Sequence, residues 1–157
     1  MQKKTVSKKI LQDIVHRIVE VAHPERIIMF GSAARGEMGP HSDIDLLVIK
    51  KGVRNPRDVA AKIYMQLYGV GKAVDIIVVS AQQVEKYRDS PYLVIYPATR
   101  DGVVVYDAER SLIAKRAREA EENYSRGQVL SGSVRDLLSG AKLSAPSGRT
   151  MPGSRHC

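Results

Sequence analysis

Apolar positions along the chain follow two patterns, a helical spacing in some segments and short continuous runs in others. The helical spacing predicts an amphipathic helix over residues 5–22. His23-Pro24 ends this helix, because the residue before a proline is pushed out of the helical region. Short apolar runs bounded by turn residues predict four strands, at residues 26–30, 43–49, 73–79 and 103–106.

Helices are predicted between and after these strands. Pro56 suits the first turn of a helix that runs to about Tyr68, and Tyr64 and Tyr68, four residues apart on that helix, are expected in the core. Ser80 is a suitable N-cap for the next helix, and Asp107 for the last one. The other predicted elements are a helical turn after Gly31-Ser32 and helices at residues 81–88, 91–99 and 107–124.

The length of 157 residues fits one domain, since domains usually have about 100–150 residues. With 43% hydrophobic and 27% charged residues, the composition is that of a soluble globular protein. No apolar run approaches the roughly 20 residues of a membrane-spanning helix, and the first residues lack a secretory signal. Cys157 is the only cysteine, which excludes a disulfide framework and makes a reducing cytoplasm the expected location.

The chain is expected to change character after its ordered part. We predict the main domain over residues 1–107, a polar helix over 108–126 and a disordered tail over 127–157. Twelve of the last 27 residues are Gly, Ser or Pro, so few apolar positions remain there to offset the entropy lost on ordering. A helical turn at Val134–Leu138 is the one element expected in the tail.

The net charge of +8 is spread along the chain rather than gathered in one block. Residues 1–108 carry 16 basic and 12 acidic side chains, and residues 109–157 carry 9 and 5, so each part contributes +4. Such a distribution fits general solubility as well as attraction to a nucleotide or a polyanion. Direct nucleic-acid binding is therefore not expected on this ground alone.

Three aspartates interrupt the predicted strands. Asp43 and Asp45 are two residues apart, so on a strand they point to one face with their alpha carbons roughly 6.5–7 Å apart. Asp75 stands alone between apolar residues of the next strand. Carboxylates in such places repel one another and lose solvation unless a cation lies between them. Three of them converging from adjacent strands would suit two Mg²⁺ ions about 3.5–4 Å apart, as in phosphoryl chemistry.

A Gly-Ser pair stands where the first strand meets a helical turn. Gly31 lets the backbone approach a phosphate closely, and Ser32 adds a hydroxyl donor beside the unpaired N–H groups of a helix start. Arg35 could extend its guanidinium to a phosphate or to an acceptor protein. Ser42, beside Asp43, could contact a phosphate or a metal-bound water, although simple turn chemistry is the favoured interpretation.

Gly31-Ser32, a ten-residue spacer, Asp43-x-Asp45 and the later Asp75 together resemble the signature of minimal nucleotidyltransferases (MNT) of the polymerase-β-like superfamily. The spacer is similar to that of the MNT branch, whose members are often antitoxins encoded beside HEPN-domain toxins. The resemblance covers residues 5–107. It implies an α/β (α+β mixed) fold of the polymerase-β-like nucleotidyltransferase type, with a small mixed sheet flanked by helices.

The resemblance also implies roles for individual residues. Gly31 and Ser32 would hold the triphosphate of a nucleotide, Asp43 and Asp45 would bind both Mg²⁺ ions, and Asp75 would complete the second metal site and help activate the acceptor hydroxyl. The implied reaction transfers AMP from ATP to a tyrosine of a HEPN toxin and releases pyrophosphate. Because the domain is small, a partner chain or a homo-oligomer is expected to supply much of the acceptor site.

Two other functions stay open at this point. The acceptor could be a small molecule such as an aminoglycoside, although transferases of that kind usually carry an additional helical domain. Alternatively, the protein could be a non-catalytic antitoxin that masks its partner. The sequence does not identify the acceptor, the preferred nucleotide, the oligomeric state or the role of residues 125–157.

Overall fold

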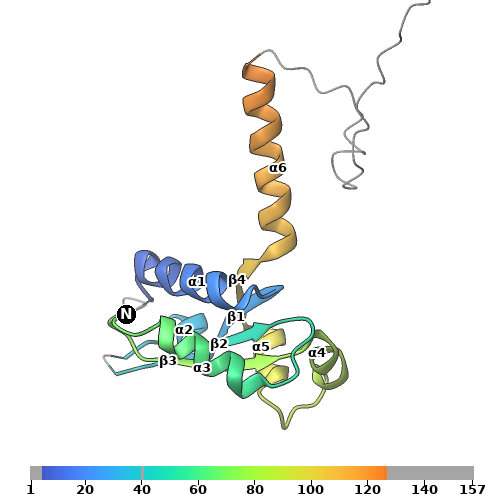
Figure 1. The fold of residues 1–157 in the computed structure, drawn as a ribbon. Coiled ribbons are helices and arrows are strands. Elements are labelled where there is room, and N and C mark those ends of the chain that lie inside the picture. The colour runs from blue at the N-terminus through green and yellow to red at the C-terminus, as the bar shows by residue number, and fades with distance from the viewer. Residues whose placement is uncertain (1–4, 40, 127–157) are drawn as a thin grey trace, which may run out of the picture. The chain divides into compact units, whose positions relative to one another are not determined.

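The structure is a computed structural model, and it describes residues 5–39 and 41–126. The tail and the helical turn at Val134–Leu138 expected from the sequence lie outside the described residues. In chain order the elements are α1 (Lys8–Ala22), β1 (Arg26–Phe30), α2 (Gly31–Arg35), β2 (Ile44–Ile49), α3 (Pro56–Gln66), β3 (Val74–Val79), α4 (Ala81–Tyr87), α5 (Ile95–Asp101), β4 (Val103–Asp107) and α6 (Ala108–Ser125) (Figure 1).

The strands form one four-stranded mixed sheet in the order β3-β2-β1-β4. β1 is antiparallel to both β2 and β4, whereas β2 and β3 are parallel. β1 therefore ends where the other three strands begin. We call this the carboxylate end of the sheet, and its strand-terminal residues are Phe30, Ile44, Val74 and Val103.

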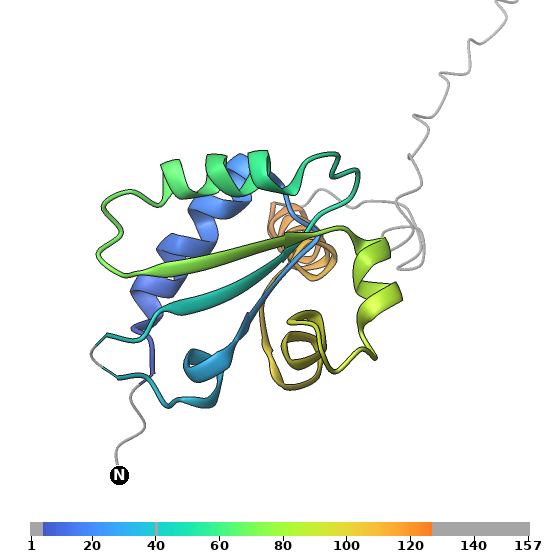
Figure 2. The ribbon, with the colours of Figure 1, turned by 90° about the horizontal axis from the view of Figure 1, so that it is seen from below.

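Both faces of the sheet are covered by helices (Figure 2). On one face, Ile14 and Ile18 of α1 and Ile63 of α3 are fully buried against the sheet. On the other face α4 and α5 enclose a second core that includes Ile95 and Ala98. β2 contributes alternate residues to the two cores, because successive side chains of a strand point to opposite faces. This double burial makes β2 the central support of the fold.

Local sequence signals account for most element boundaries. Pro56 lies in the first turn of α3, and the Ser80 side chain accepts a hydrogen bond from the Gln83 N–H at 3.1 Å in a capping box. Asp107 caps α6 by accepting from two backbone N–H groups of its first turn, at 3.1 and 3.2 Å. His23 ends α1 with φ 46°, so this residue before a proline leaves the helix through the left-handed region.

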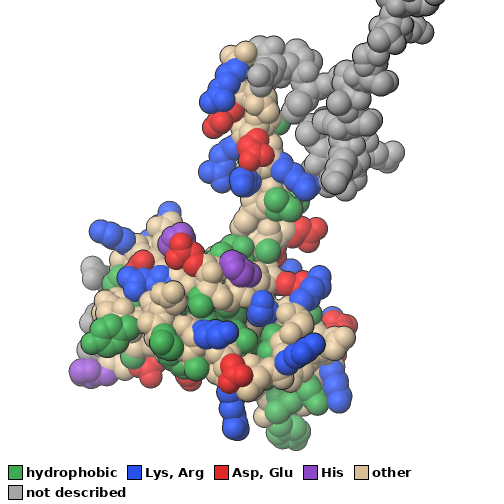
Figure 3. All heavy atoms as spheres, in the orientation of Figure 1, with side chains coloured by type: hydrophobic (Ala, Val, Ile, Leu, Met, Phe, Trp, Pro, Cys, Tyr) green, Lys and Arg blue, Asp and Glu red, His purple; other side chains and the backbone are tan. Residues whose placement is uncertain are grey.

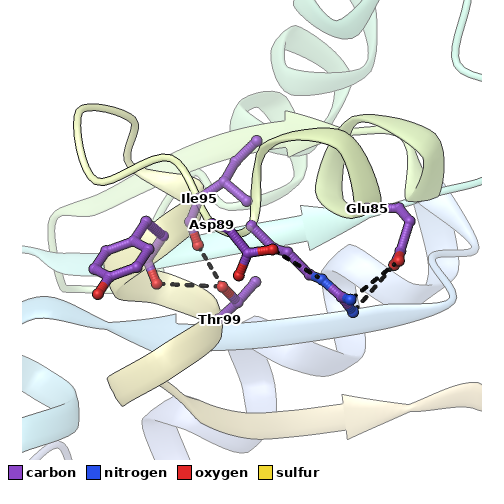
Figure 4. A network of polar contacts seen from close by, with 6 residues as sticks. Glu85, Asp89, Ile95 and Thr99 are labelled. Carbon is purple, nitrogen blue, oxygen red and sulfur yellow. Dashed lines mark hydrogen bonds and ion pairs between the residues drawn. The ribbon is translucent and has the colours of Figure 1, made fainter.

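Two details of the helices differ from the sequence predictions. The short helix expected at residues 91–99 is present, but it begins later and spans Ile95–Asp101, where the Thr99 hydroxyl donates to the Ile95 carbonyl at 2.8 Å (Figure 4). Tyr64 and Tyr68 were expected in the core, but they are 44% and 90% exposed. The reason is that α3 buries mainly Ile63, and Leu67 beyond its end, so the tyrosines lie beside the buried side of the helix.

The chain divides into two compact units, Met1–Leu112 and Ile113–Cys157. In the second unit, the described part of α6 carries acidic and basic side chains along its length (Figure 3), including Lys115 and Glu119, which approach each other to 3.9 Å. Among the helices of the described residues, none combines the length and apolar character that crossing a membrane requires.

Gly102 links α5 to β4, and we predict that Gly102→Ala destabilises the fold. An added Cβ would overlap the Ala98 carbonyl oxygen and lie 2.5 Å from Ile28 Cγ2, so backbone would have to move. We expect a loss of about 1–3 kcal/mol in the free energy of unfolding, measured by urea denaturation. Gly39→Ala is the control, because its Cβ would meet only Ser42 Oγ at 3.4 Å. Equal stability of the two variants would contradict this packing argument.

Candidate functional site

Asp43, Asp45 and Asp75, the candidate metal ligands identified from the sequence, all lie at the carboxylate end of the sheet. Asp45 is the second residue of β2 and pairs with Asp75 of β3 in parallel register. Asp43 lies two residues before Asp45, just outside the strand. Paired residues on adjacent strands lie roughly 4.8 Å apart and share a face of the sheet, so the Asp45 and Asp75 side chains are neighbours. The structure thus brings together residues that are about thirty positions apart in the sequence.

Gly31 lies directly against the Asp45 carboxylate. It has φ +66°, a conformation that favours glycine, and it opens the short helix α2 after β1. A Cβ added there would overlap Asp45 Oδ2 and lie 3.4 Å from its Cγ. The immediate neighbour of Gly31 is therefore a carboxylate of the same chain, and the expected approach to a phosphate stays a prediction.

Asp45 lies close enough to Asp75 and Asp43 for their charges to act on its carboxyl group. Partial burial raises the pKa of the Asp45 carboxyl above its ordinary value, and the charges of Asp75 and Asp43 raise this pKa further. The Arg35 guanidinium opposes them and lowers the pKa. Asp43 and Asp75 themselves are exposed to solvent. A cation at this end of the sheet would relieve the repulsion that Asp45 experiences.

The two remaining candidates have local partners. The Arg35 Nε donates a hydrogen bond to Glu37 Oε2 at 2.7 Å, so a neighbouring acid holds this guanidinium. The guanidinium is also close enough to Asp45 to lower the pKa of its carboxyl. The Ser42 hydroxyl accepts a hydrogen bond from the Gly39 N–H at 2.7 Å. This bond is the turn chemistry that the sequence allowed for Ser42.

Carboxylate oxygens are the ligands that Mg²⁺ prefers in proteins, so the chemistry of Asp43, Asp45 and Asp75 fits such a cation. Within residues 5–39 and 41–126, no group of three His, Cys, Asp or Glu side chains is already gathered closely enough to hold a metal. Repulsion among uncompensated carboxylates gives a physical reason for this spacing. The residues present therefore fit a divalent cation in their chemistry, and all three lie at the same end of the sheet.

Tyr64 is a further residue of the site that the sequence analysis missed. Its hydroxyl donates to Asp75 Oδ1 at 3.1 Å and accepts a hydrogen bond from the Ile76 N–H at 2.9 Å. Burial raises the pKa of the Tyr64 phenol, with the nearby Asp75 carboxylate acting in the same direction and the Ile76 N–H in the opposite one. No local sequence signal identifies this contact, because it depends on how α3 packs beside β3.

The sequence has one family match that covers most of the chain. The model of a family described as a nucleotidyltransferase domain matches residues 8–129. The chain belongs to the nucleotidyltransferase domain family. This assignment confirms the fold and the enzyme class expected from the motif, and the matched region includes α1 to α6. No curated protein matches this nucleotidyltransferase domain in sequence.

Three solved structures are similar to this nucleotidyltransferase domain. A protein from Sulfolobus solfataricus, provisionally described as a nucleotidyltransferase, has 26% identity and a TM-score of 0.48, covering 65% of this chain and 81% of its own. A toxin–antitoxin structure with AMP-PNP has 15% identity and a TM-score of 0.44, covering 73% and 94%. A mutant of the toxin–antitoxin pair MntA–HpeT has 14% identity and a TM-score of 0.42, covering 71% and 91%.

We predict that Asp45→Asn stabilises the metal-free protein at neutral pH. A carboxyl whose pKa is raised by folding ionises more readily in the unfolded chain, so its ionisation lowers the stability of the fold. This penalty is absent well below the ordinary pKa of 3.8 and grows as the pH rises above it. The Tm of the variant should therefore exceed that of the parent at pH 7, and the difference should shrink towards pH 4. A lower Tm at pH 7 would mean that Asp45 supports the fold.

We also predict that Gly31→Ala abolishes stabilisation by Mg²⁺. Gly52→Ala is a matched control, because Gly52 has φ +64° with nothing within 4 Å of an added Cβ. Both variants should lose about 1–2 kcal/mol through left-handed strain. Only Gly31→Ala displaces the Asp45 carboxylate, so Mg²⁺ should raise the Tm of the parent and of Gly52→Ala but not that of Gly31→Ala. Equal Mg²⁺ responses would contradict a metal role for Asp45.

Proposed function

We propose that the protein is a Mg²⁺-dependent nucleotidyltransferase that moves a nucleoside monophosphate, AMP from ATP, to a hydroxyl group. The observation that carries this proposal is the convergence of Asp43, Asp45 and Asp75 at one end of the sheet, against Gly31. Apolar strands give no structural reason for three acids at this place. Membership of the nucleotidyltransferase domain family supports the same conclusion.

The proposed roles of the residues follow from their positions. The acceptor oxygen forms a bond to the α-phosphorus while the bond from this phosphorus to the oxygen bridging the β-phosphorus breaks, and pyrophosphate leaves. Gly31 and Ser32 would hold the triphosphate. Asp43 and Asp45 would bind two Mg²⁺ ions, which when bound neutralise phosphate charge and stabilise the leaving group. Asp75 would complete the metal site and accept the proton of the acceptor hydroxyl.

Arg35 and Ser42 have subordinate roles in this proposal. Arg35 already influences Asp45, and release from Glu37 would allow its guanidinium to bind a phosphate. Ser42 fixes the turn that leads into Asp43 through its bond with the Gly39 N–H. Both residues would therefore assist nucleotide binding without taking part in bond making.

For the acceptor we propose a tyrosine of a partner HEPN-type toxin, with this chain acting as its antitoxin. Support comes from the sequence motif with its ten-residue spacer and from the size of the domain, which leaves the acceptor site to a partner or to a second copy of the chain. The similarity to toxin–antitoxin structures is too distant to add support.

The reaction can be tested by label transfer. The full chain is incubated with Mg²⁺ and α-labelled ATP, with and without the protein encoded by the neighbouring gene, and labelled proteins are separated by electrophoresis. We expect label on the partner. Asp43→Asn should lower this transfer more than about 100-fold, since it removes a metal ligand. Asp89→Asn is the matched control, because its side chain is 92% exposed and pairs with Arg88 of the same segment.

The other outcomes separate the competing functions. A stable complex with the partner but no label would contradict catalysis and indicate an antitoxin that masks its target. Label on an added aminoglycoside rather than on the partner would indicate a small-molecule transferase. Equal label with the Asp43→Asn variant would exclude the proposed metal-binding role of Asp43.

A further inference from the structure

Tyr64 joins the candidate catalytic carboxylate Asp75 to the edge of the sheet. The phenol oxygen lies 3.1 Å from Asp75 Oδ1 and 2.9 Å from the Ile76 nitrogen. One hydroxyl thus donates to the carboxylate and accepts from the next backbone amide. These two bonds form a short bridge between a side chain that the proposed reaction needs and the strand that carries it.

The packing of α3 and β3 produces this bridge. Within residues 5–39 and 41–126, β3 lies at the edge of the sheet with β2 as its one paired strand, so Ile76 can direct its N–H outwards to a side chain. α3 is anchored by Ile63, which is fully buried in the core next to β3. Tyr64 follows Ile63 on the helix and reaches the strand edge, where the views show α3 beside β3 (Figures 1 and 2).

Asp75 needs an external constraint to have one orientation. It is exposed, and it stands opposite Asp45, whose charge it repels. An exposed carboxylate beside a like charge would turn towards solvent unless a donor holds it. Among the described residues, the donor that the structure gives to Asp75 Oδ1 is the Tyr64 hydroxyl.

We propose that Tyr64 is a positioning residue, whose hydroxyl holds Asp75 Oδ1 so that the second carboxylate oxygen is available to a divalent cation and to the acceptor. This inference rests on the proposed function of Asp75. Tyr64 is not itself the acceptor of the nucleotide, because its hydroxyl is engaged in hydrogen bonds with Asp75 on one side and the Ile76 amide on the other. Tyr64 contributes by restricting the conformational freedom of the Asp75 carboxylate before the cation binds.

The test compares Tyr64→Phe with Tyr68→Phe in the full chain. Each substitution removes one hydroxyl from the same region, but Tyr68 is 90% exposed. The phenylalanine keeps the ring of Tyr64 and its packing but removes both hydrogen bonds of the hydroxyl, so we expect Tyr64→Phe to remain folded with a modestly lower Tm than the parent.

The bridge itself can be measured without any catalytic activity. In Tyr64→Phe the Ile76 amide loses its acceptor, so its hydrogen exchange should become faster and its proton resonance should shift, whereas Tyr68→Phe should leave both unchanged. Mn²⁺ serves as a paramagnetic probe of the cation site. We expect its affinity to fall about 10-fold in Tyr64→Phe, as for other groups that orient a metal ligand.

A double-mutant cycle tests whether Tyr64 acts through Asp75. Asp75→Asn should weaken Mn²⁺ binding by itself, and Tyr64→Phe should add no further loss in that background. Additive losses would overturn the proposal, because they would show that the hydroxyl affects the cation by another route. Wild-type Mn²⁺ affinity in Tyr64→Phe would overturn it as well.

Kinetics with the labelled nucleotide give the remaining readout. Tyr64→Phe should lower kcat about 10-fold while the KM for ATP stays within about twofold, since Gly31 and Ser32 are proposed to hold the triphosphate. Label attached to Tyr64 in the wild-type chain would overturn the proposal and make this tyrosine an acceptor. If the wild-type chain transfers no label at all, the proposed function fails, whereas the Ile76 and Mn²⁺ measurements still decide whether Tyr64 positions Asp75.

Discussion

The parallel register between β2 and β3 is the constraint on which the candidate site depends. It places Asp45 opposite Asp75 on neighbouring strands, so two carboxylates are held together by backbone hydrogen bonds rather than by any attraction between them. The Gly31 backbone packs directly against the Asp45 carboxylate, since a side chain at position 31 would overlap that carboxylate. A slip of one residue would send Asp45 to the opposite face and separate the acids.

The fold tolerates this repulsion because its apolar core is elsewhere along the same strands. β2 alternates between two buried clusters, and residues such as Leu46 and Leu47 are fully buried. Burial of this kind stabilises a strand by about 1.5–3 kcal/mol for each large apolar side chain. The acids are confined to the end of the strands, where Asp43 and Asp75 remain in contact with water. The repulsion among the carboxylates is thereby confined to the end of the sheet, where a bound cation would offset it.

The role of α3 illustrates how one element can serve both stability and the candidate site. Ile63 anchors the helix in the core, and the adjacent Tyr64 reaches the sheet edge and bonds Asp75. The hydroxyl also accepts a hydrogen bond from the Ile76 amide on the edge of β3, where the described part of the chain offers no further strand. A helix that covers the sheet thus fixes the surroundings of a carboxylate at its end, and this relation depends on the packing of two elements rather than on any local motif.

The sequence by itself determined the elements whose signals are local. The strand Arg26–Phe30 follows from a short apolar run, and the starts of α3, α4 and α6 follow from Pro56, Ser80 and Asp107, because periodicity and capping act within a few residues. The Gly-Ser and Asp-x-Asp spacing likewise indicated the nucleotidyltransferase family, and the roles of its residues stay predictions.

Only the tertiary structure decided which of these residues touch. In the structure Asp45 lies opposite Asp75, and Gly31 packs against Asp45. Tyr64, which the sequence placed in the core, donates a hydrogen bond to Asp75 instead. Sequence reasoning could not determine these contacts, because they join residues on different elements. Such contacts are fixed by strand register and helix packing, which minimise the free energy of the whole chain rather than of any one segment.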